Sequence, residues 1–550
     1  MASRHVLDGF WDRRNVNGVN NNFVFLFDQI SALLTNVNSI GSDLNTKAQT
    51  YENNFNYLFE SVEKTLKISS DANQAIQQAQ EANAENKSVQ KQIDQLIIDN
   101  GQSDAEVTQA RIDINGVSSD TLKERIDKVQ KSTIDASQKS ELYKKLYGSL
   151  SNLTLPNALN MAVPFSVRIA LNGDVDINYD VSVNKNKVLK RYYIDVKKGS
   201  NTNDGSKEAP FHDIYRALKY GDADEIVINE GVYGWNSGVA GYNQTKPFNL
   251  IGVGKVVIGA HRENLTWNVN SSYSNVYQTN ASSVVEMVDY KDANDIKFLQ
   301  SQKSIQDVSK NAGSYYIDST NNIYVRTHDD RVPDDQILPN MTSDAIKVEN
   351  NPNVYFENIN FSNSTKITTT TANNKFFAKD CHFTIGSGGN ALSVEGYNLS
   401  IVQNCIAAHA TMDGFNYHIK NNNVTKAIEI DCKGFNNGRN GADQNNGSTS
   451  HDGGQIIRIR GEYFNNGGPN VIDVNEGSTS VNIGVHSHSS RATSGTVSNS
   501  NFKNGNVGTS KMYLYNCVSN NSDYSVVTAT SQNSTTTIEN SLLLEPQGEA

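Results

Sequence analysis

The chain has 550 residues, a formal net charge of −11 and no cluster of Lys or Arg, so nucleic acid is not an expected partner. No apolar stretch approaches the roughly 18 to 20 residues that span a bilayer, and the polar N-terminus lacks a secretory signal, so neither membrane insertion nor secretion by a leader is expected. Hydrophobic residues make up only 37%, and the second half is rich in Asn, Ser, Thr and Gly, which favours a repetitive all-β body.

Residues 22–104 are expected to form an α-helical coiled-coil stalk. Apolar and small residues alternate there at spacings of three and four, with one polar core position: Ala72, Ala75, Ala79, Ala82, Asn86, Val89, Ile93 and Leu96. The other interpretation is an amphipathic helix packed on its own chain. Residues 1–21, which precede the stalk, are expected to be a tail that orders on a partner.

Residues 105–150 are expected to be a connector with a short helix. Asn115-Gly116 is a turn signal, and Leu122, Ile126 and Val129 then recur at helical spacing. The segment resembles a connector found on adsorption proteins of phages that infect Gram-positive bacteria. The resemblance rests on Ala110-Arg111, Gly116, Thr121-Leu122 and Glu124 to Asp127.

A small β-rich linker is expected over residues 151–191, and a β-helix over 192–550. A strand at Tyr193 to Val196 leads into a turn, a short helix after Pro210-Phe211, and a strand at Glu225 to Asn229. The stretch resembles the N-terminal module of right-handed parallel β-helix proteins of the pectate-lyase-like superfamily. The matching residues are Asp204-Gly205-Ser206, Pro210-Phe211, Ile214, Ala217 and Gly231 to Tyr233. This resemblance implies a fold and not a reaction.

An internal repeat supports the same fold class, mainly β with one coil per repeat. A polar residue, or Gly484 in one repeat, precedes a small or apolar residue at Ile359, Cys381, Cys405, Cys432, Gly461, Val485 and Cys517. All four cysteines occupy this position. We therefore expect them in an inward stack of small side chains, rather than in a metal site or a catalytic centre.

Residues from about 235 to 340 do not fit the repeat and are expected to form an insert. They contain Trp267, Tyr273, Tyr277, Tyr290, Tyr315 and Tyr316. These aromatic residues either stack on sugar rings or pack in the insert's own core.

The densest polar cluster lies between residues 413 and 491. The candidate catalytic residues are Asp413, Asp443, His451, Asp452, Asp473 and Glu476. The candidate substrate-binding residues are His418, Arg458, His486, His488 and Arg491. Glycosidic cleavage needs one protonated acid and one base or nucleophile, and a His beside them could instead serve phosphodiester cleavage. Asp413, Asp443 and Asp473 are expected on neighbouring coils in one patch, although each acid taken alone is better explained as a turn-former. No cofactor is expected, and no metal, because no Asp-x-Asp-x-Asp-Gly loop is present.

Together the resemblances imply a homotrimeric tail spike or neck appendage of a phage with a Gram-positive host. The chain would be made in the host cytoplasm, and its N-terminus would dock on tail or collar proteins of the virion. The β-helix would bind wall teichoic acid or surface polysaccharide and cleave it as a hydrolase. Two alternatives stay open: a non-enzymatic adhesin spike, and a free polysaccharide lyase.

Overall fold

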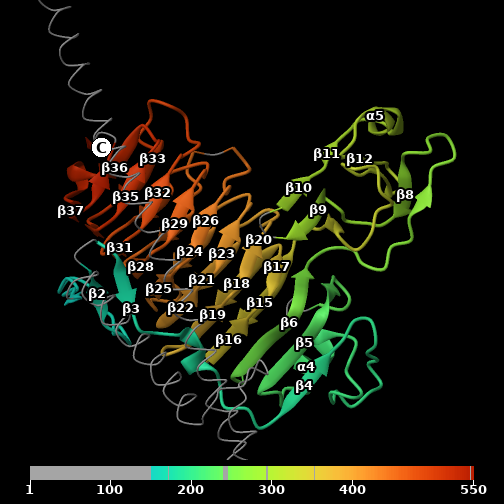
Figure 1. Ribbon diagram of the computed structural model, residues 1–550, viewed down its shortest axis with the longest axis horizontal. Coiled ribbons are helices and arrows are strands. Elements are labelled where there is room, and N and C mark those ends of the chain that lie inside the picture. The colour runs from blue at the N-terminus through green and yellow to red at the C-terminus, as the bar shows by residue number, and fades with distance from the viewer. Residues whose placement is uncertain are drawn as a thin grey trace, which may run out of the picture. The chain divides into compact units, whose positions relative to one another are not determined.

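The computed structural model describes residues 150–170, 173–238, 246–292, 295–351, 353–441, 443–544 and 547–549. The expected tail, stalk and connector lie outside these residues, apart from Leu150. The described chain is mainly β, with parallel strands that wind as a β-helix (Figure 1). No helix within these ranges is long and apolar enough to cross a membrane.

The first coils follow the expected N-terminal module. Strand β4 (Arg191–Ile194) pairs in parallel with β5 (Glu225–Tyr233), which pairs with β6 (Phe248–Gly259). Helix α4 (Ile214–Tyr220) lies between β4 and β5 and ends at Gly221, whose φ of 67° is readily adopted by glycine. Its buried residues are Ile214, Ala217 and Leu218, the face predicted from their spacing.

Three parallel sheets form the sides of the β-helix. Sheet I contains β15 (Asp344–Glu349), β18 (Ser364–Thr368), β21 (Leu392–Glu395), β24 (Phe415–His418), β27 (Ser448–Ser450), β30 (Val471–Asp473), β33 (Ser500–Asn504), β36 (Tyr524–Thr528) and β39 (Gln547–Glu549). Sheet II contains the first part of β6, β16 (Asn353–Glu357), β19 (Lys375–Lys379), β22 (Leu399–Gln403), β25 (Lys426–Ile430), β28 (Gln455–Ile459), β31 (Thr479–Ile483), β34 (Lys511–Tyr515) and β37 (Thr535–Glu539). Sheet III contains the end of β6, β17 (Asn360–Ser362), β20 (His382–Thr384), β23 (Ile406–Ala408), β26 (Lys433–Phe435), β29 (Glu462–Phe464), β32 (His486–His488), β35 (Val518–Asn520) and β38 (Leu542–Leu543). Residues after 490 therefore still belong to the coil.

The predicted repeat coincides with the turn from sheet II to sheet III. The polar residue of the repeat adopts a left-handed conformation, for example at Asn358, Asp380 and Asn404, with φ of 55°, 52° and 53°. Asn and Asp tolerate this conformation better than other non-glycine residues. The next residue points inward, and all four cysteines are fully buried in the main core. The inward stack is confirmed.

The insert is shorter than expected, because β6 pairs within the coil. It lies between Gly259 and Asp344 and projects from the coil (Figure 1). Its elements are β7 (Asn268–Val269), β8 (Tyr277–Asn280), β9 (Glu286–Asp292), β10 (Asp295–Phe298), β11 (Gln300–Ser301), α5 (Ile305–Lys310), β12 (Ser314–Ile317), β13 (Asn322–Arg326) and β14 (Ile337–Asn340). Tyr315 is buried and Trp267 is half-buried in the insert's own core, whereas the buried Tyr290 packs between the insert and the coil, in a cluster with Val257 and Ile385. The packing interpretation therefore holds for Tyr315 and Trp267.

The linker covers the outer face of sheet II. It contains β1 (Ser151–Asn152), β2 (Val167–Ile169), β3 (Val175–Ile177) and the short helix η1 (Val181–Asn184). Its apolar residues pack on outward residues of sheet II, including Phe377, Ile428 and Val481. Hydrogen bonds attach the linker to strands at distant positions along sheet II. Asn516 Nδ2 after β34 donates to Gly173 O at 3.1 Å, and Asn186 N donates to Asn249 Oδ1 of β6 at 2.9 Å.

Candidate functional site

A row of charged and imidazole side chains follows the outer face of sheet I. Alternate residues of a strand face opposite sides, so Leu392 and Val394 enter the core while Glu395 is directed outward. Glu395 on β21 is the register partner of His418 on β24. We call this set the polar row: Asp344, Lys366, Glu395, His418, Lys420, His451 and Asp452.

Glu395 is held by two lysines. Lys366 Nζ lies 2.9 Å from its Oε1, and Lys420 Nζ lies 3.1 Å from its Oε2. Thr368 Oγ1 also donates to Oε2, at 3.1 Å. Burial opposes ionisation of Glu395, but the hydrogen bonds from the two lysines outweigh burial and lower its pKa. The carboxylate is therefore ionised at neutral pH.

Asp344 has the opposite electrostatic environment. Burial raises its pKa, and the nearby Lys366 and Lys347 offset only part of that effect. Glu395 also acts on Asp344 and raises its pKa further. The polar row thus contains two interacting carboxyl groups whose pKa values are shifted in opposite directions, which is the usual arrangement of an acid and a base in one site.

Two histidines are stacked beside Glu395. The rings of His418 and His451 are parallel, with centroids 4.1 Å apart. Burial lowers the pKa of both, and the neighbouring His418 helps to bring that of His451 to about 4. His418 Nδ1 lies 3.6 Å from Asp452 Oδ2, and Asn475 Nδ2 donates to Asp452 Oδ1 at 2.6 Å. Both imidazoles are therefore neutral at pH 7, and His418 can accept a proton next to a carboxylate.

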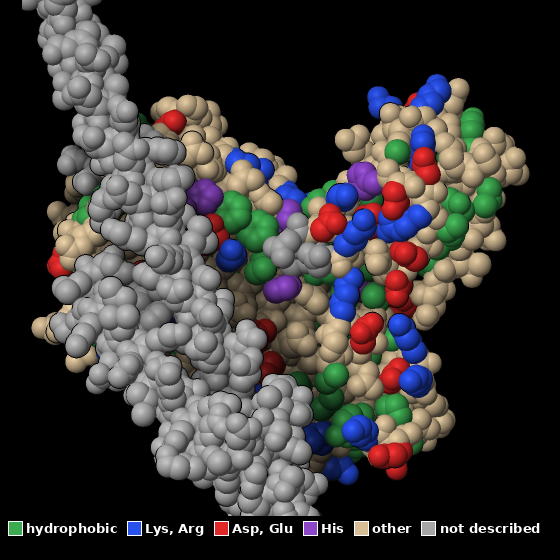
Figure 2. Space-filling view, in the orientation of Figure 1, with side chains coloured by type: hydrophobic (Ala, Val, Ile, Leu, Met, Phe, Trp, Pro, Cys, Tyr) green, Lys and Arg blue, Asp and Glu red, His purple; other side chains and the backbone are tan. Residues whose placement is uncertain are grey.

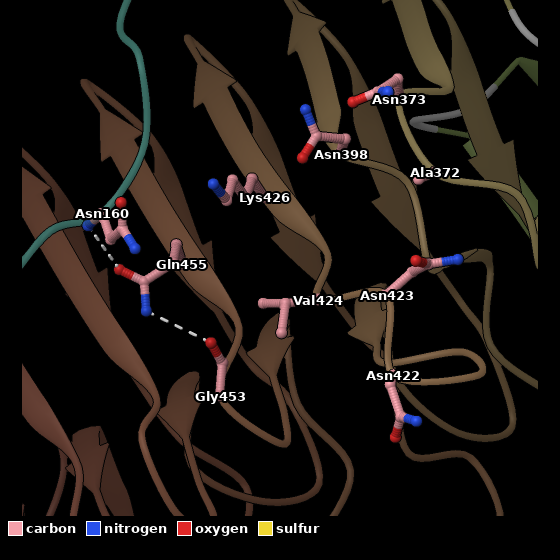
Figure 3. Close-up of a pocket in the computed structure, with 11 residues that line it drawn as sticks. Asn160, Ala372, Asn373, Asn398, Asn422, Asn423, Val424, Lys426, Gly453 and Gln455 are labelled. Carbon is pink, nitrogen blue, oxygen red and sulfur yellow. Dashed lines mark hydrogen bonds between the residues drawn. The ribbon is translucent and has the colours of Figure 1, made fainter.

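A hollow of about 370 Å³ adjoins the end of the polar row, at the turns between sheets I and II. It is lined by Gly453, which follows Asp452, and by amide side chains from several turns: Asn373, Asn398, Asn422, Asn423 and Gln455 (Figure 3). Asn160 of the linker contributes another side and donates its backbone N–H to Gln455 Oε1 at 2.9 Å. Amides offer both donors and acceptors, so this lining suits a ligand with many hydroxyl groups.

Only three of the residues predicted from the sequence lie in the polar row: His418, His451 and Asp452. The other predicted acids do not join them, and the expected patch of Asp413, Asp443 and Asp473 is wrong. Asp413 lies opposite Asn446 on the next coil, since Gly414 N donates to Asn446 O. Asp443 accepts instead from Thr493 N at 3.3 Å, and the exposed Glu476 accepts from Thr509 N at 2.9 Å.

Asp413 is a buried turn-former. Its Oδ1 accepts from Asn446 N at 2.7 Å, and its Oδ2 accepts from Asn416 Nδ2 at 2.5 Å. Burial raises its pKa to about 6, because these hydrogen bonds supply no full positive charge. Both oxygens are engaged in holding the loop, so a catalytic role for Asp413 is not supported.

Arg458 and Asp473 point into the coil and cannot bind a polymer at the surface. Both are fully buried, and two hydrogen bonds of 2.9 Å join the guanidinium to the carboxylate. Arg458 Nε also donates to Ser448 Oγ at 2.7 Å, and Ser448 Oγ in turn donates to Glu429 Oε1 at 2.7 Å. Tyr463 donates to the other oxygen of Glu429. Asn482 Oδ1 accepts from Arg458 Nη1 at 3.3 Å. We call this set the interior network: Glu429, Ser448, Arg458, Tyr463, Asp473 and Asn482.

The remaining predicted binding residues lie elsewhere. His486 and His488 belong to β32 on the outer face of sheet III. Arg491 donates to two backbone carbonyls, Asn465 O at 2.6 Å and Asn437 O at 2.7 Å, and so braces neighbouring loops. These residues are not part of the polar row.

Asp344, Lys366, Glu395 and Lys420 were missed by the sequence reasoning. The sequence feature that could have identified them is the strand register of sheet I. Glu395 and His418 are each the last residue of a strand, just before a turn, and they are register partners. The repeat that was recognised marks the turn between sheets II and III. Placing the strands of sheet I in the same register would have brought Glu395 beside His418.

No protein-family model matches the sequence, and no curated protein matches it. Among solved structures, a complex of XylC with xylose has a TM-score of 0.42 at 11% identity, covering 66% of this chain and 70% of that chain. A glycoside hydrolase has a TM-score of 0.39 at 12% identity, covering 66% and 94%. The Gp54 tailspike of Acinetobacter baumannii bacteriophage AP22, in complex with A. baumannii capsular saccharide, has a TM-score of 0.24 at 10% identity, covering 60% and 65%. At about a tenth identity, a similarity in architecture does not carry over a substrate or a reaction.

Proposed function

We propose that the chain is a bacteriophage receptor-binding spike that binds a bacterial surface glycopolymer and cleaves it at the polar row. The observation that carries this proposal is the pair of carboxyl groups, Asp344 and Glu395, with pKa values shifted in opposite directions around Lys366. Glycoside hydrolysis requires one protonated carboxylic acid and one carboxylate.

In this proposal Asp344 is the general acid and protonates the leaving glycosidic oxygen. Glu395, ionised between Lys366 and Lys420, is the base or nucleophile on the other side of the scissile bond. His418 accepts a hydrogen bond from a sugar hydroxyl. The amide-lined hollow beside Gly453 holds neighbouring sugar units of the polymer.

The virion role rests on the connector and N-terminal module resemblances. The chain would assemble as a homotrimer through the stalk, with residues 1–21 docked on tail or collar proteins. The polymer would be wall teichoic acid or a surface polysaccharide of a Gram-positive host.

The test is fragment release from purified teichoic acids and polysaccharides, followed by size separation. Glu395→Gln and Asp344→Asn are expected to bind polymer and to abolish shortening. The matched control is Glu476→Gln, an exposed acid outside the polar row, which is expected to cleave normally. Melting curves establish that each variant is folded.

The pH dependence of cleavage gives a second readout. Because the pKa of Asp344 is raised and that of Glu395 is lowered, the rate should fall at high pH as Asp344 loses its proton, and at low pH as Glu395 gains one. Unaltered cleavage in both variants would exclude the polar row as the active site. Binding without any shortening by the native protein would identify an adhesin.

A further inference from the structure

Three side chains suitable for binding a metal meet on sheet III, away from the polar row. Glu462 lies on β29, and His486 and His488 lie on the neighbouring β32. One ligand atom from each residue lies within 4.8 Å of the other two. All three side chains are half-buried. In Figure 2, histidine and hydrophobic side chains gather on the coil face beside the insert.

The spacing of these atoms is close to that of a zinc site. Two ligands at about 2.0 to 2.1 Å from Zn²⁺, at a tetrahedral angle, lie roughly 3.4 Å apart. Glu462 Oε1 and His488 Nε2 are 3.5 Å apart. Strand pairing fixes the backbones, because Glu462 is the register partner of His486. Bringing the three atoms onto one ion would therefore require side-chain rotation and no change in strand pairing.

Neighbouring side chains orient the ligands. Phe464 stacks on His488 with ring centroids 4.9 Å apart, and Phe435 stacks on Phe464 at 5.0 Å. Lys433 Nζ lies 2.7 Å from Glu462 Oε2, which leaves Oε1 directed at the histidines. Partners of this kind, which fix the orientation of a ligand, are a regular feature of metal sites.

We propose that Glu462, His486 and His488 bind one divalent transition metal ion, with Zn²⁺ as the ion of choice. Two imidazoles and one carboxylate form a donor set that favours zinc over calcium or magnesium. Three protein ligands leave one coordination position for water or for an oxygen of a bound polymer. Asn520 Oδ1 lies 3.4 Å from His486 Nε2. The ligands come from two adjacent coils. The only part of the site that is continuous in the sequence is His-Ser-His at 486 to 488, so a search for sequence motifs would not predict the site.

The first experiment is calorimetric titration of the untagged, EDTA-treated full-length protein with ZnCl₂. One saturable ion per chain is expected. His486→Ala and His488→Ala should abolish saturable binding, and Glu462→Gln should weaken it by at least about 10-fold. The matched control is His328→Ala, which removes an exposed histidine of the insert and should leave the titration unchanged.

Co²⁺ absorption identifies the ligand atoms. The visible bands of a four-coordinate nitrogen and oxygen site are expected, without the sulfur charge-transfer band that the four buried cysteines would produce in a misfolded protein. Melting curves confirm that the variants are folded, and Glu462→Gln supports the test if a histidine variant is not. Failure to saturate with Zn²⁺, or equal binding by the native protein and His486→Ala, would overturn the proposal. Neither result bears on cleavage at the polar row.

Discussion

The first coils of the β-helix are filled by phenylalanine, whereas the later coils enclose the interior network. A single interior column of sheet II passes from one to the other through register partners, in the order Phe356, Ala378, Val402, Glu429, Arg458, Asn482 and Leu514. Both parts are equally inaccessible to solvent. The β-helix therefore accepts a charged side chain in its interior where another interior side chain supplies the partner, since an unpaired buried charge would be prohibitive.

The largest effect is expected from Arg458→Met, which leaves Asp473 buried without its cation. We expect a loss of about 3 to 5 kcal/mol in the free energy of unfolding, measured by urea denaturation. Adding Asp473→Val removes the stranded charge and should recover most of that loss. A double variant no more stable than the single one would show that the network has a value beyond charge pairing.

Asp413 is buried without a cation, whereas Asp473 is paired with Arg458. The contribution of Asp413 to the free energy of unfolding should therefore depend on pH. Its folded pKa is about 6 against an ordinary value of 3.8, so its contribution to stability is full below pH 3.8 and is lost as the pH rises through 6. Relative to Asp413→Asn, the native protein should therefore lose about 2 kcal/mol between pH 4 and pH 7. Parallel urea curves at the two pH values measure this loss. An unchanged difference between the two proteins would contradict the raised pKa.

Phe383→Leu tests the aromatic part of the interior. The rings of Phe361 and Phe383 are stacked on adjacent coils, with centroids 5.4 Å apart and planes 2° apart. Leucine keeps most of the apolar volume and loses the ring contact, so a cost of about 1 kcal/mol is expected in the same denaturation experiment. A cost as large as that of Arg458→Met would remove the contrast between the two parts.

The smallest effect is expected from Glu429→Gln. Burial raises the pKa of Glu429, and the hydroxyls of Ser448 and Tyr463 already donate to it. An uncharged amide should therefore cost no more than about 1 kcal/mol at neutral pH. A loss of several kcal/mol would mean that Glu429 is ionised and needed by Arg458.

The parts of the fold that could be predicted from the sequence are those where the backbone or the interior allows only a few residue types. The left-handed turn between sheets II and III selects Asn or Asp, and the next position must fit the interior, so Asp380-Cys381 and Asn404-Cys405 were recognisable. Arg458 and Asp473 were misplaced because a charged residue in a polar stretch is usually exposed. Glu395 and His418 were not associated because turns of unequal length separate the strands of sheet I, and only the strand register brings them together.

The linker over sheet II has a mechanical consequence. It is attached at points from the turn after β34 to β6, through Asn516, Gln455, Gln403 and Asn249. A force applied at Leu150 must therefore shear many hydrogen bonds and apolar contacts at once, instead of peeling β4 from the end of the stack. Each coil contacts mainly its neighbours, so without the linker such a load would fall on one coil at a time. The linker therefore spreads a pulling force over several coils of the β-helix.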